Sequence, residues 1–270
     1  MEQRVIPATG EALPVLGLGT WQSFDRQPGS DLSAQRSVVE ILERGGGRLI
    51  DSSPMYGHAE AAVGAVTGGR APFFYATKVW TEGQEAGVRQ LERSMTLMGC
   101  RVLDLAQVHN LVDWRTHLRT LRRWKEAGRV RYIGVTHYTE SAHAALGQVL
   151  IDEPLDFVQV NYSIVERAAA SRLLPLAQER GVAVLVNRPF GEGRHLRALA
   201  AKPLPPWAAG LGIQSWSAFL LRYILGHSAV TCVIPATANP AHAAENYAAG
   251  SGPFPDAAAR KGMEAYVDSL

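Results

Sequence analysis

One pattern repeats along this chain: a short apolar run, a signal that starts a helix, an amphipathic stretch, and a glycine before the next apolar run. Short apolar runs bounded by turn residues predict buried strands, and strands that alternate with helices predict parallel βαβ units. The pattern occurs eight times, and eight parallel strands close into a barrel that typically takes about 250 residues. The 270 residues therefore accommodate such a barrel with few residues left over.

The expected strands are the apolar runs at 16–19, 48–51, 73–78, 103–108, 130–136, 157–160, 182–186 and 230–234. Helices are expected at 33–44, 60–67 and 216–225, and four more are expected to begin at the N-cap residues Thr81, Asp113, Thr139 and Asn239. Pro175 lies in another helical stretch and indicates a late helix start or a kink. The connection 191–212 contains three prolines and is expected to be irregular.

Two segments lie outside the repeat. A glycine turn at Gly10 predicts a small hairpin, and the stretch from Asp256 to Ser269 predicts a final helix. No low-complexity linker interrupts the chain. We therefore predict an α/β fold with a single domain over 1–270. It consists of a hairpin at about 4–15, a (β/α)8 TIM barrel at about 16–250 and a C-terminal helix at about 256–269.

Composition argues against several classes of function. The net charge of +2 is too small and too dispersed to indicate binding of nucleic acid or of an acidic membrane surface. No apolar run approaches the roughly 20 residues that span a bilayer, and the first residues do not resemble a secretory signal. Cys100 and Cys232 lack metal-ligand spacing and are expected to be buried thiols in a reducing compartment. We expect a cytoplasmic protein, and nothing in the sequence implies a protein partner.

Four polar residues follow three of the predicted strands: Asp51, Tyr56, Lys78 and His109. A barrel gathers the residues at the carboxyl ends of its strands around one opening, so these side chains are expected to meet. A free phenol has a pKa near 10 and is a weak acid at neutral pH, but a neighbouring ammonium lowers that pKa. The set predicts proton donation to a carbonyl oxygen, with Tyr56 as acid, Lys78 and Asp51 as its tuning pair, and His109 as the group that orients the carbonyl.

The chain resembles the aldo-keto reductase family from Gly17 to Asn246. The motifs that carry the resemblance occur in order along the chain: Gly17-Leu18-Gly19-Thr20-Trp21, Asp51-Ser52-Ser53-Pro54-Met55-Tyr56-Gly57, Ala76-Thr77-Lys78-Val79-Trp80, Val108-His109-Asn110, Ile133-Gly134-Val135-Thr136, Gln159-Val160-Asn161-Tyr162-Ser163, and Ile234-Pro235 followed by Glu245-Asn246. The resemblance implies a (β/α)8 barrel, a nicotinamide cofactor, usually NADP(H), and reduction of aldehydes or ketones. It assigns the catalytic roles to the same four residues.

The resemblance also implies which residues hold the cofactor. Gly19, Thr20, Trp21 and Asp51 match the positions that line the nicotinamide ribose, and Thr136, His137 and Gln159 match those that hold the carboxamide. The loop Pro189-Phe190-Gly191 matches the cover of the pyrophosphate, with Arg188 as a phosphate partner. Glu245 and Asn246 match adenine contacts. Trp21 and Trp80 are expected to form the walls of the substrate pocket with Tyr56 and His109.

Three departures from the family pattern bear on the cofactor. Where members that prefer the 2′-phosphate carry cations, this chain has Ala236 and His242, with Thr237 and Asn239 as neutral donors. A phosphate without a cation loses a contact worth about 1.5–3 kcal/mol, so we expect a weakened preference for NADP(H) and possible use of NAD(H). Asn187 replaces an aromatic residue that often stacks on the nicotinamide. His137 stands where asparagine is common.

Two other functions remain open from the sequence. Asp51, His58, His109 and His137 could serve a metal-dependent hydrolase on the same barrel, although no paired histidines have ligand spacing. A non-catalytic protein that senses nicotinamide cofactors would carry the same binding motifs. For the reductase, the short loop after the fourth strand predicts an open site that accepts small, planar or apolar carbonyl compounds.

Overall fold

The computed structural model describes residues 1–270 and contains ten strands and ten α-helices. The strands are β1 (Gln3–Val5), β2 (Ala12–Pro14), β3 (Leu18–Gly19), β4 (Leu49–Asp51), β5 (Phe74–Val79), β6 (Leu103–His109), β7 (Val130–Thr136), β8 (Phe157–Asn161), β9 (Ala183–Asn187) and β10 (Val230–Val233). The helices are α1 (Ser33–Arg44), α2 (Ala59–Thr67), α3 (Gln84–Met98), α4 (Trp114–Glu126), α5 (His143–Asp152), α6 (Leu173–Glu179), α7 (Arg194–Leu199), α8 (Trp216–Leu225), α9 (Pro240–Ala248) and α10 (Ala257–Asp268).

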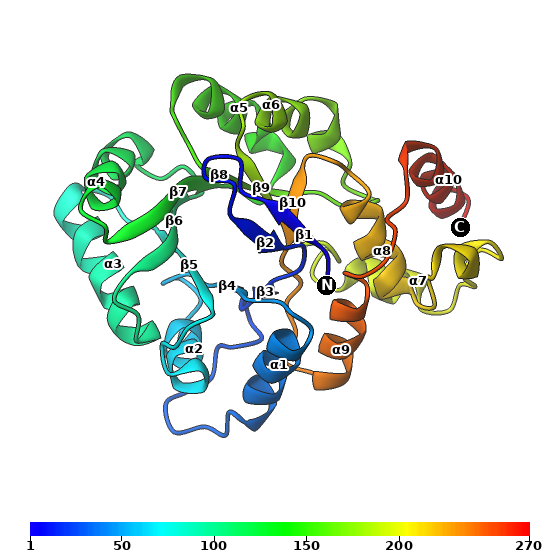
Figure 1. Cartoon of the computed structure of the whole chain (residues 1–270), viewed down its shortest axis with the longest axis horizontal. Helices are drawn as coiled ribbons and strands as arrows, with labels where there is room; N and C mark the ends of the chain where they lie inside the picture. The colour runs from blue at the N-terminus through cyan, green and yellow to red at the C-terminus, as the bar shows by residue number, and fades with distance from the viewer.

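Eight parallel strands form one sheet in chain order, from β3 to β10. The sheet closes because the segment around β3 meets β10: Gly17 N donates to Val233 O at 2.9 Å, and a parallel bridge joins Leu16 to Val233. Figure 1 shows the helices arranged around these strands, with α10 outside the ring beside α7 and α8. The predicted (β/α)8 barrel, with its N-terminal hairpin and additional C-terminal helix, is confirmed.

The hairpin of β1 and β2 lies across one mouth of the barrel (Figure 1). Its fully buried Ile6 and Leu13 join the side chains inside the barrel, among them Phe74, Tyr132 and Phe157. The Tyr132 and Phe157 rings meet edge to face with centroids 5.5 Å apart. Packing therefore closes the amino-terminal end of the barrel, and the carboxyl end is left for a site. None of the helices is long and apolar enough to cross a membrane.

The structure corrects several expectations about the helices. α3 begins after Gly83, so Thr81 is not its N-cap. Asp113 precedes α4 with a positive φ, and its side chain accepts a hydrogen bond from Gly83 N at 2.9 Å instead of capping its own helix. The connection 191–212 contains the helix α7, so it is more ordered than its prolines predict.

Other local expectations hold. Pro175 lies in the first turn of α6, where its missing N–H removes no helical hydrogen bond. Asn239 caps α9 by accepting a hydrogen bond from Ala241 N at 2.9 Å, with Pro240 as the first helical residue. The expectation for Thr139, in contrast, was wrong: it precedes a short 3-10 turn (Glu140–Ala142), its side chain makes no capping bond, and α5 begins only at His143.

Candidate active site

The four predicted catalytic residues lie together at the carboxyl ends of neighbouring strands. Asp51 is the last residue of β4, Lys78 is the fifth of the six residues of β5, and His109 is the last residue of β6. Tyr56 comes from the loop after β4. The parallel register brings these strand ends to the same opening.

A buried ion pair forms the base of the site. The Lys78 ammonium donates to Asp51 Oδ2 at 2.6 Å and to the Ser52 carbonyl at 2.8 Å, and the Lys78 side chain is 0% exposed. Burial lowers the pKa of Lys78, but the charge of Asp51 and the neighbouring Tyr56 raise it above its ordinary value. Lys78 is therefore a fixed positive charge, because its proton is retained at every physiological pH.

Two amides also bind Asp51. Gln107 and Gln159 each donate from Nε2 to Asp51 Oδ1, at 3.2 and 3.0 Å. The orientation of the Gln159 amide is thereby fixed, and its Oε1 accepts from Thr136 Oγ1 at 3.2 Å. Asp51 thus connects the lysine to the amides of β6 and β8 and, through Gln159, to Thr136 of β7, and both of its oxygens are occupied.

Tyr56 lies against this ion pair. Lys78 Nζ is 5.1 Å from the centroid of the Tyr56 ring. Burial raises the pKa of the phenol, the Lys78 charge lowers it, and the net direction is upward. This corrects the simple expectation of a lowered pKa, because desolvation of the phenolate outweighs the effect of the neighbouring ammonium. Tyr56 therefore holds its proton, as a proton donor must.

His109 faces Tyr56 and Trp80 across the opening. The centroid of its ring is 6.0 Å from that of Tyr56 and 6.5 Å from that of Trp80. Its Nδ1 is 3.1 Å from the hydroxyl of Ser53. Burial, Lys78 and His137 lower the pKa of His109 to about 2, so its imidazole is neutral. A neutral ring can donate one hydrogen bond without adding charge beside Lys78.

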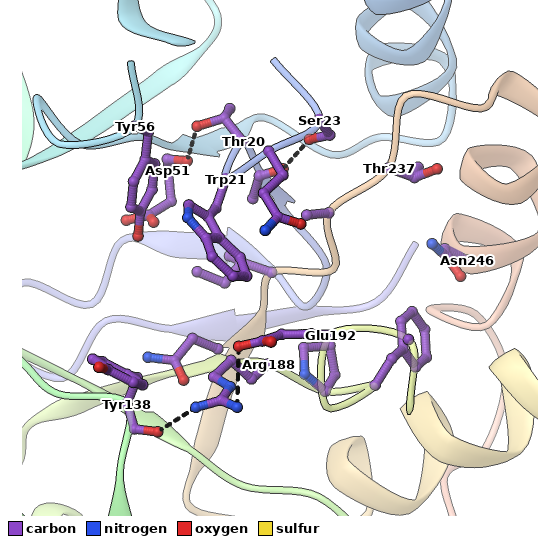
Figure 2. A pocket seen from close by; sticks show the side chains of 18 of the residues that line it. Thr20, Trp21, Ser23, Asp51, Tyr56, Tyr138, Arg188, Glu192, Thr237 and Asn246 are labelled. Atoms are coloured by element: carbon purple, nitrogen blue, oxygen red, sulfur yellow. Dashed lines mark hydrogen bonds and ion pairs between the residues drawn. The ribbon is translucent and has the colours of Figure 1, made fainter. Parts of the chain in front are cut away.

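A cleft of about 1010 Å³ extends from these residues across the barrel mouth. In Figure 2, Tyr56 and Asp51 lie at one end, and Thr237 and Asn246 lie at the other. The predicted site residues that line the cleft are Gly19, Thr20, Trp21, Asp51, Tyr56, Trp80, His109, Thr136, Gln159, Arg188, Pro189, Phe190, Thr237, His242, Glu245 and Asn246. One continuous cavity therefore joins the catalytic set to most of the predicted cofactor positions.

Four predicted residues do not line this cleft. Lys78 lies beneath its wall, and Gly191 and Asn239 lie outside its lining. The ring of His137 makes its contacts within its own loop. Its Nδ1 accepts a hydrogen bond from Tyr138 N at 3.0 Å, and the ring stacks on that of Tyr138 with centroids 5.5 Å apart. The structure therefore places the Thr136 and Gln159 side chains at the cleft, but not the imidazole of His137.

Two arginines line the cleft differently. Arg188 pairs with Glu192 at 3.1 Å and donates to Tyr138 O at 3.1 Å, as Figure 2 shows. Arg197, in α7, lines the same section and is exposed, with no carboxylate within ion-pair distance. Of these two arginines, only Arg197 has no carboxylate partner, and the role of Arg188 as a phosphate partner stays a prediction.

The far end of the cleft carries little positive charge. Ala236, Thr237 and His242 line it, together with Glu245 and Asn246. Burial raises the pKa of Glu245, but hydrogen bonds from serine hydroxyls and the nearby His242 lower it below its ordinary range. The carboxylate of Glu245 is therefore negative, and the segment from β10 to the end of α9 contains no lysine or arginine to balance a phosphate there.

Sequence reasoning missed several residues of this site. Gln107 points into the barrel from β6 two residues before His109, a spacing of two that could have signalled its direction. Ser53 belongs to a motif that was recognised, but its contact with His109 depends on loop geometry. Arg197 and Trp216 lie in or after the connection that was expected to be irregular.

Comparisons with known proteins agree with this geometry. The sequence profile of the Aldo/keto reductase family matches residues 15–264. The chain belongs to the aldo/keto reductase family. It is thus an oxidoreductase, as predicted, and the recognition made from its motifs is confirmed.

Individual relatives are distant. An aldo-keto reductase of Mycobacterium sp. (strain JLS) is 28% identical over 248 residues, which cover 88% of this chain and 84% of the relative. The NADH-specific methylglyoxal reductase of Escherichia coli is 29% identical over 72% of this chain and 68% of its own length. A crystal structure of an aldo/keto reductase from Klebsiella pneumoniae in complex with NADP and acetate superposes with a TM-score of 0.81 at 24% identity, over 98% of this chain and 95% of that one.

The residues of the metal-dependent alternative are not assembled. His58 Nδ1 lies 3.2 Å from Asp25 Oδ1, and His109 contacts Ser53. No three His, Cys, Asp or Glu side chains are placed to hold a metal ion together. The family membership and this arrangement both favour the reductase.

Proposed function

We propose that this protein reduces small aldehydes or ketones, with a reduced nicotinamide dinucleotide as the hydride donor and Tyr56 as the general acid. The observation that carries the proposal is the buried Lys78–Asp51 pair beside Tyr56, at the end of a cleft of about 1010 Å³ that reaches Thr237 and Asn246. When bound, the cofactor supplies hydride to the carbonyl carbon. Tyr56 then donates its proton to the carbonyl oxygen, which gains negative charge, and the Lys78 ammonium stabilises the phenolate that remains.

The residues of the cleft fit such a cofactor. Thr136 and Gln159 present a hydroxyl and an oriented amide near Tyr56, as a carboxamide requires. Asn187 Oδ1 is a buried acceptor without a partner in the same wall. We propose that Gly19, Thr20 and Trp21 hold the nicotinamide ribose. Pro189, Phe190 and Arg197 would hold the pyrophosphate, and Thr237, Glu245 and Asn246 the adenosine.

We infer that both NADP(H) and NAD(H) are used. The far end of the cleft offers Thr237 and His242 to a 2′-phosphate, but no permanent cation. A ribose hydroxyl can bind Glu245, whereas a phosphate would be repelled by it. Relatives of both kinds exist, because the Klebsiella structure holds NADP and the Escherichia coli reductase is NADH-specific.

The substrate end favours small carbonyl compounds with apolar substituents. Trp21 and Trp80 line it and remain 39% and 43% exposed, and Met55 and Tyr138 complete an open rim. Open aromatic walls stabilise planar groups without strict shape selection. We therefore propose a broad substrate range, which sharp discrimination for one compound would contradict. Two buried free cysteines are compatible with a cytoplasmic location.

The decisive experiment follows the absorbance of reduced cofactor, phosphorylated or not, against a panel of small aldehydes and ketones. Wild type is expected to turn over, and Tyr56→Phe to lose at least about 100-fold in kcat while the Kd of each cofactor changes little. If the protein only sensed the cofactor, wild type and Tyr56→Phe would bind it equally well, and neither would reduce a carbonyl compound. Full activity of Tyr56→Phe would refute the assignment of the acid.

A further inference from the structure

The hydroxyl of Ser53 occupies a restricted position beside His109. Ser53 is fully buried, and its Oγ lies 3.1 Å from His109 Nδ1. The other contact of this oxygen is with Met55 N, which donates to it at 3.4 Å. The hydroxyl therefore accepts from the backbone and has one hydrogen left to donate.

The number of hydrogens available between Ser53 Oγ and His109 Nδ1 decides which of the two neutral forms the imidazole adopts. If Nδ1 carried the proton, it would donate to Ser53, and the hydroxyl hydrogen would be buried without an acceptor. A buried donor without a partner is costly. If Nδ1 is bare, the Ser53 hydroxyl donates to it and every group is satisfied. The remaining proton of the ring then lies on Nε2.

The Nε2 atom is the one that faces the cleft. His109 lines the cavity, and Nε2 has no hydrogen-bond partner in the protein and is not among its buried unsatisfied atoms. We propose that Ser53 is a positioning residue that holds His109 in the Nε2–H form, so that the ring donates a hydrogen bond to the carbonyl oxygen of the substrate. The consequence for turnover rests on the proposed reductase function, but the form of the ring does not.

The chemistry explains why the form matters. A carbonyl oxygen between Tyr56 and His109 can accept from both, and its developing negative charge is stabilised by both donors. In the other form, the bare Nε2 would present a lone pair to that oxygen and repel it. Burial and Lys78 lower the pKa of His109 to about 2, so the ring carries only one proton near neutral pH. The two neutral forms therefore remain distinct.

The test is nitrogen NMR of the full chain with ring-labelled histidine, with and without reduced cofactor. The chain has eight histidines, and the pair of signals that disappears in His109→Gln belongs to His109. Wild type is expected to show a pyridine-type Nδ1 and a pyrrole-type Nε2, unchanged between about pH 6 and 9. A pyrrole-type Nδ1 in wild type would overturn the proposal.

Two substitutions complete the experiment. Ser53→Ala is expected to move both His109 signals toward the average of the two forms and to lower kcat about 3- to 10-fold, with the cofactor Kd unchanged. Ser52→Ala is the matched control: it removes an equally buried neighbouring hydroxyl, which contacts Thr20 instead, and the His109 signals should not move. Unchanged His109 signals in Ser53→Ala would also overturn the proposal. Because the signals do not depend on turnover, an inactive wild type would refute the proposed function alone.

Discussion

At the scale of single residues, the chemistry of the site depends on the protonation states of three side chains. Lys78 is buried beside Asp51 and keeps its charge, Tyr56 keeps its proton, and His109 stays neutral. The identities of these residues could be predicted from their places after apolar runs. The direction of the Tyr56 pKa could not, because it depends on how deeply the phenol is buried, and burial is set by the loop after β4.

These protonation states predict the pH dependence of reduction. In the proposed reaction Tyr56 must be protonated, so activity should be lost as pH rises through its pKa. Burial raises that pKa above the ordinary value, which is near 10. His109 titrates at about 2 and contributes no limb near neutrality. With cofactor saturating, kcat should be flat from about pH 6 to 9 and decline only above about pH 10. A limb near pH 6.5 would contradict the neutral imidazole.

At the scale of elements, the β9–α7 connection shows what the sequence could not resolve. The motif around Pro189 was recognised, but its neighbour Arg188 is bound by Glu192 and by the backbone of Tyr138. The spacing of four residues between Arg188 and Glu192 hints at a pair. However, both residues have positive φ, so helical spacing was no guide to their contact. The arginine without a carboxylate partner, Arg197, lies in α7. This helix was not predicted because the connection 191–212 contains three prolines.

The consequence for Arg197 is measurable. Arg197→Ala should raise the Kd of NADPH and NADH alike by about 10-fold, because a phosphate common to both cofactors loses a charge-assisted hydrogen bond. Arg123→Ala, on α4, removes the same charge from an exposed position outside the cleft and should leave both values unchanged. Cofactor fluorescence titration gives the constants. An effect confined to NADPH would place Arg197 at the 2′-phosphate instead.

Helix α9 supplies the second test at this scale. Introducing a permanent charge with His242→Arg should shift the ratio of NADPH to NADH affinity about 10-fold toward NADPH, since a guanidinium can bind a 2′-phosphate and offset Glu245. His242→Gln, which keeps a neutral donor, should leave the ratio near that of wild type. The same titrations with both cofactors measure it. A ratio unaffected by arginine would show that this end of the cleft does not hold the 2′ position.

At the scale of the whole molecule, the alternation of apolar runs and helices was sufficient to predict the barrel, and most element bounds fell within a few residues of those observed. The closure itself was not visible in the sequence, because β3 has only two residues and the contact with β10 depends on glycine backbone. Periodicity reports which face of a segment is buried, but not how closely two backbones approach. If the chain is a single domain, as predicted, it should unfold in one cooperative transition.

Gly17 tests the closure directly. A Cβ at this position would lie 2.9 Å from the backbone oxygen of Leu49, and Gly17 N is one of the donors that join the segment around β3 to β10. Gly17→Ala should lower the free energy of unfolding by about 1–3 kcal/mol, because the neighbouring backbone cannot yield without loosening the barrel. Gly262→Ala, in α10 with open space around it, should instead be neutral or raise it by up to about 1 kcal/mol. Urea unfolding followed by far-UV circular dichroism and by tryptophan fluorescence measures both. Coincident single transitions are expected if the chain is one domain, and a Gly17→Ala variant as stable as wild type would mean that the barrel does not depend on this contact.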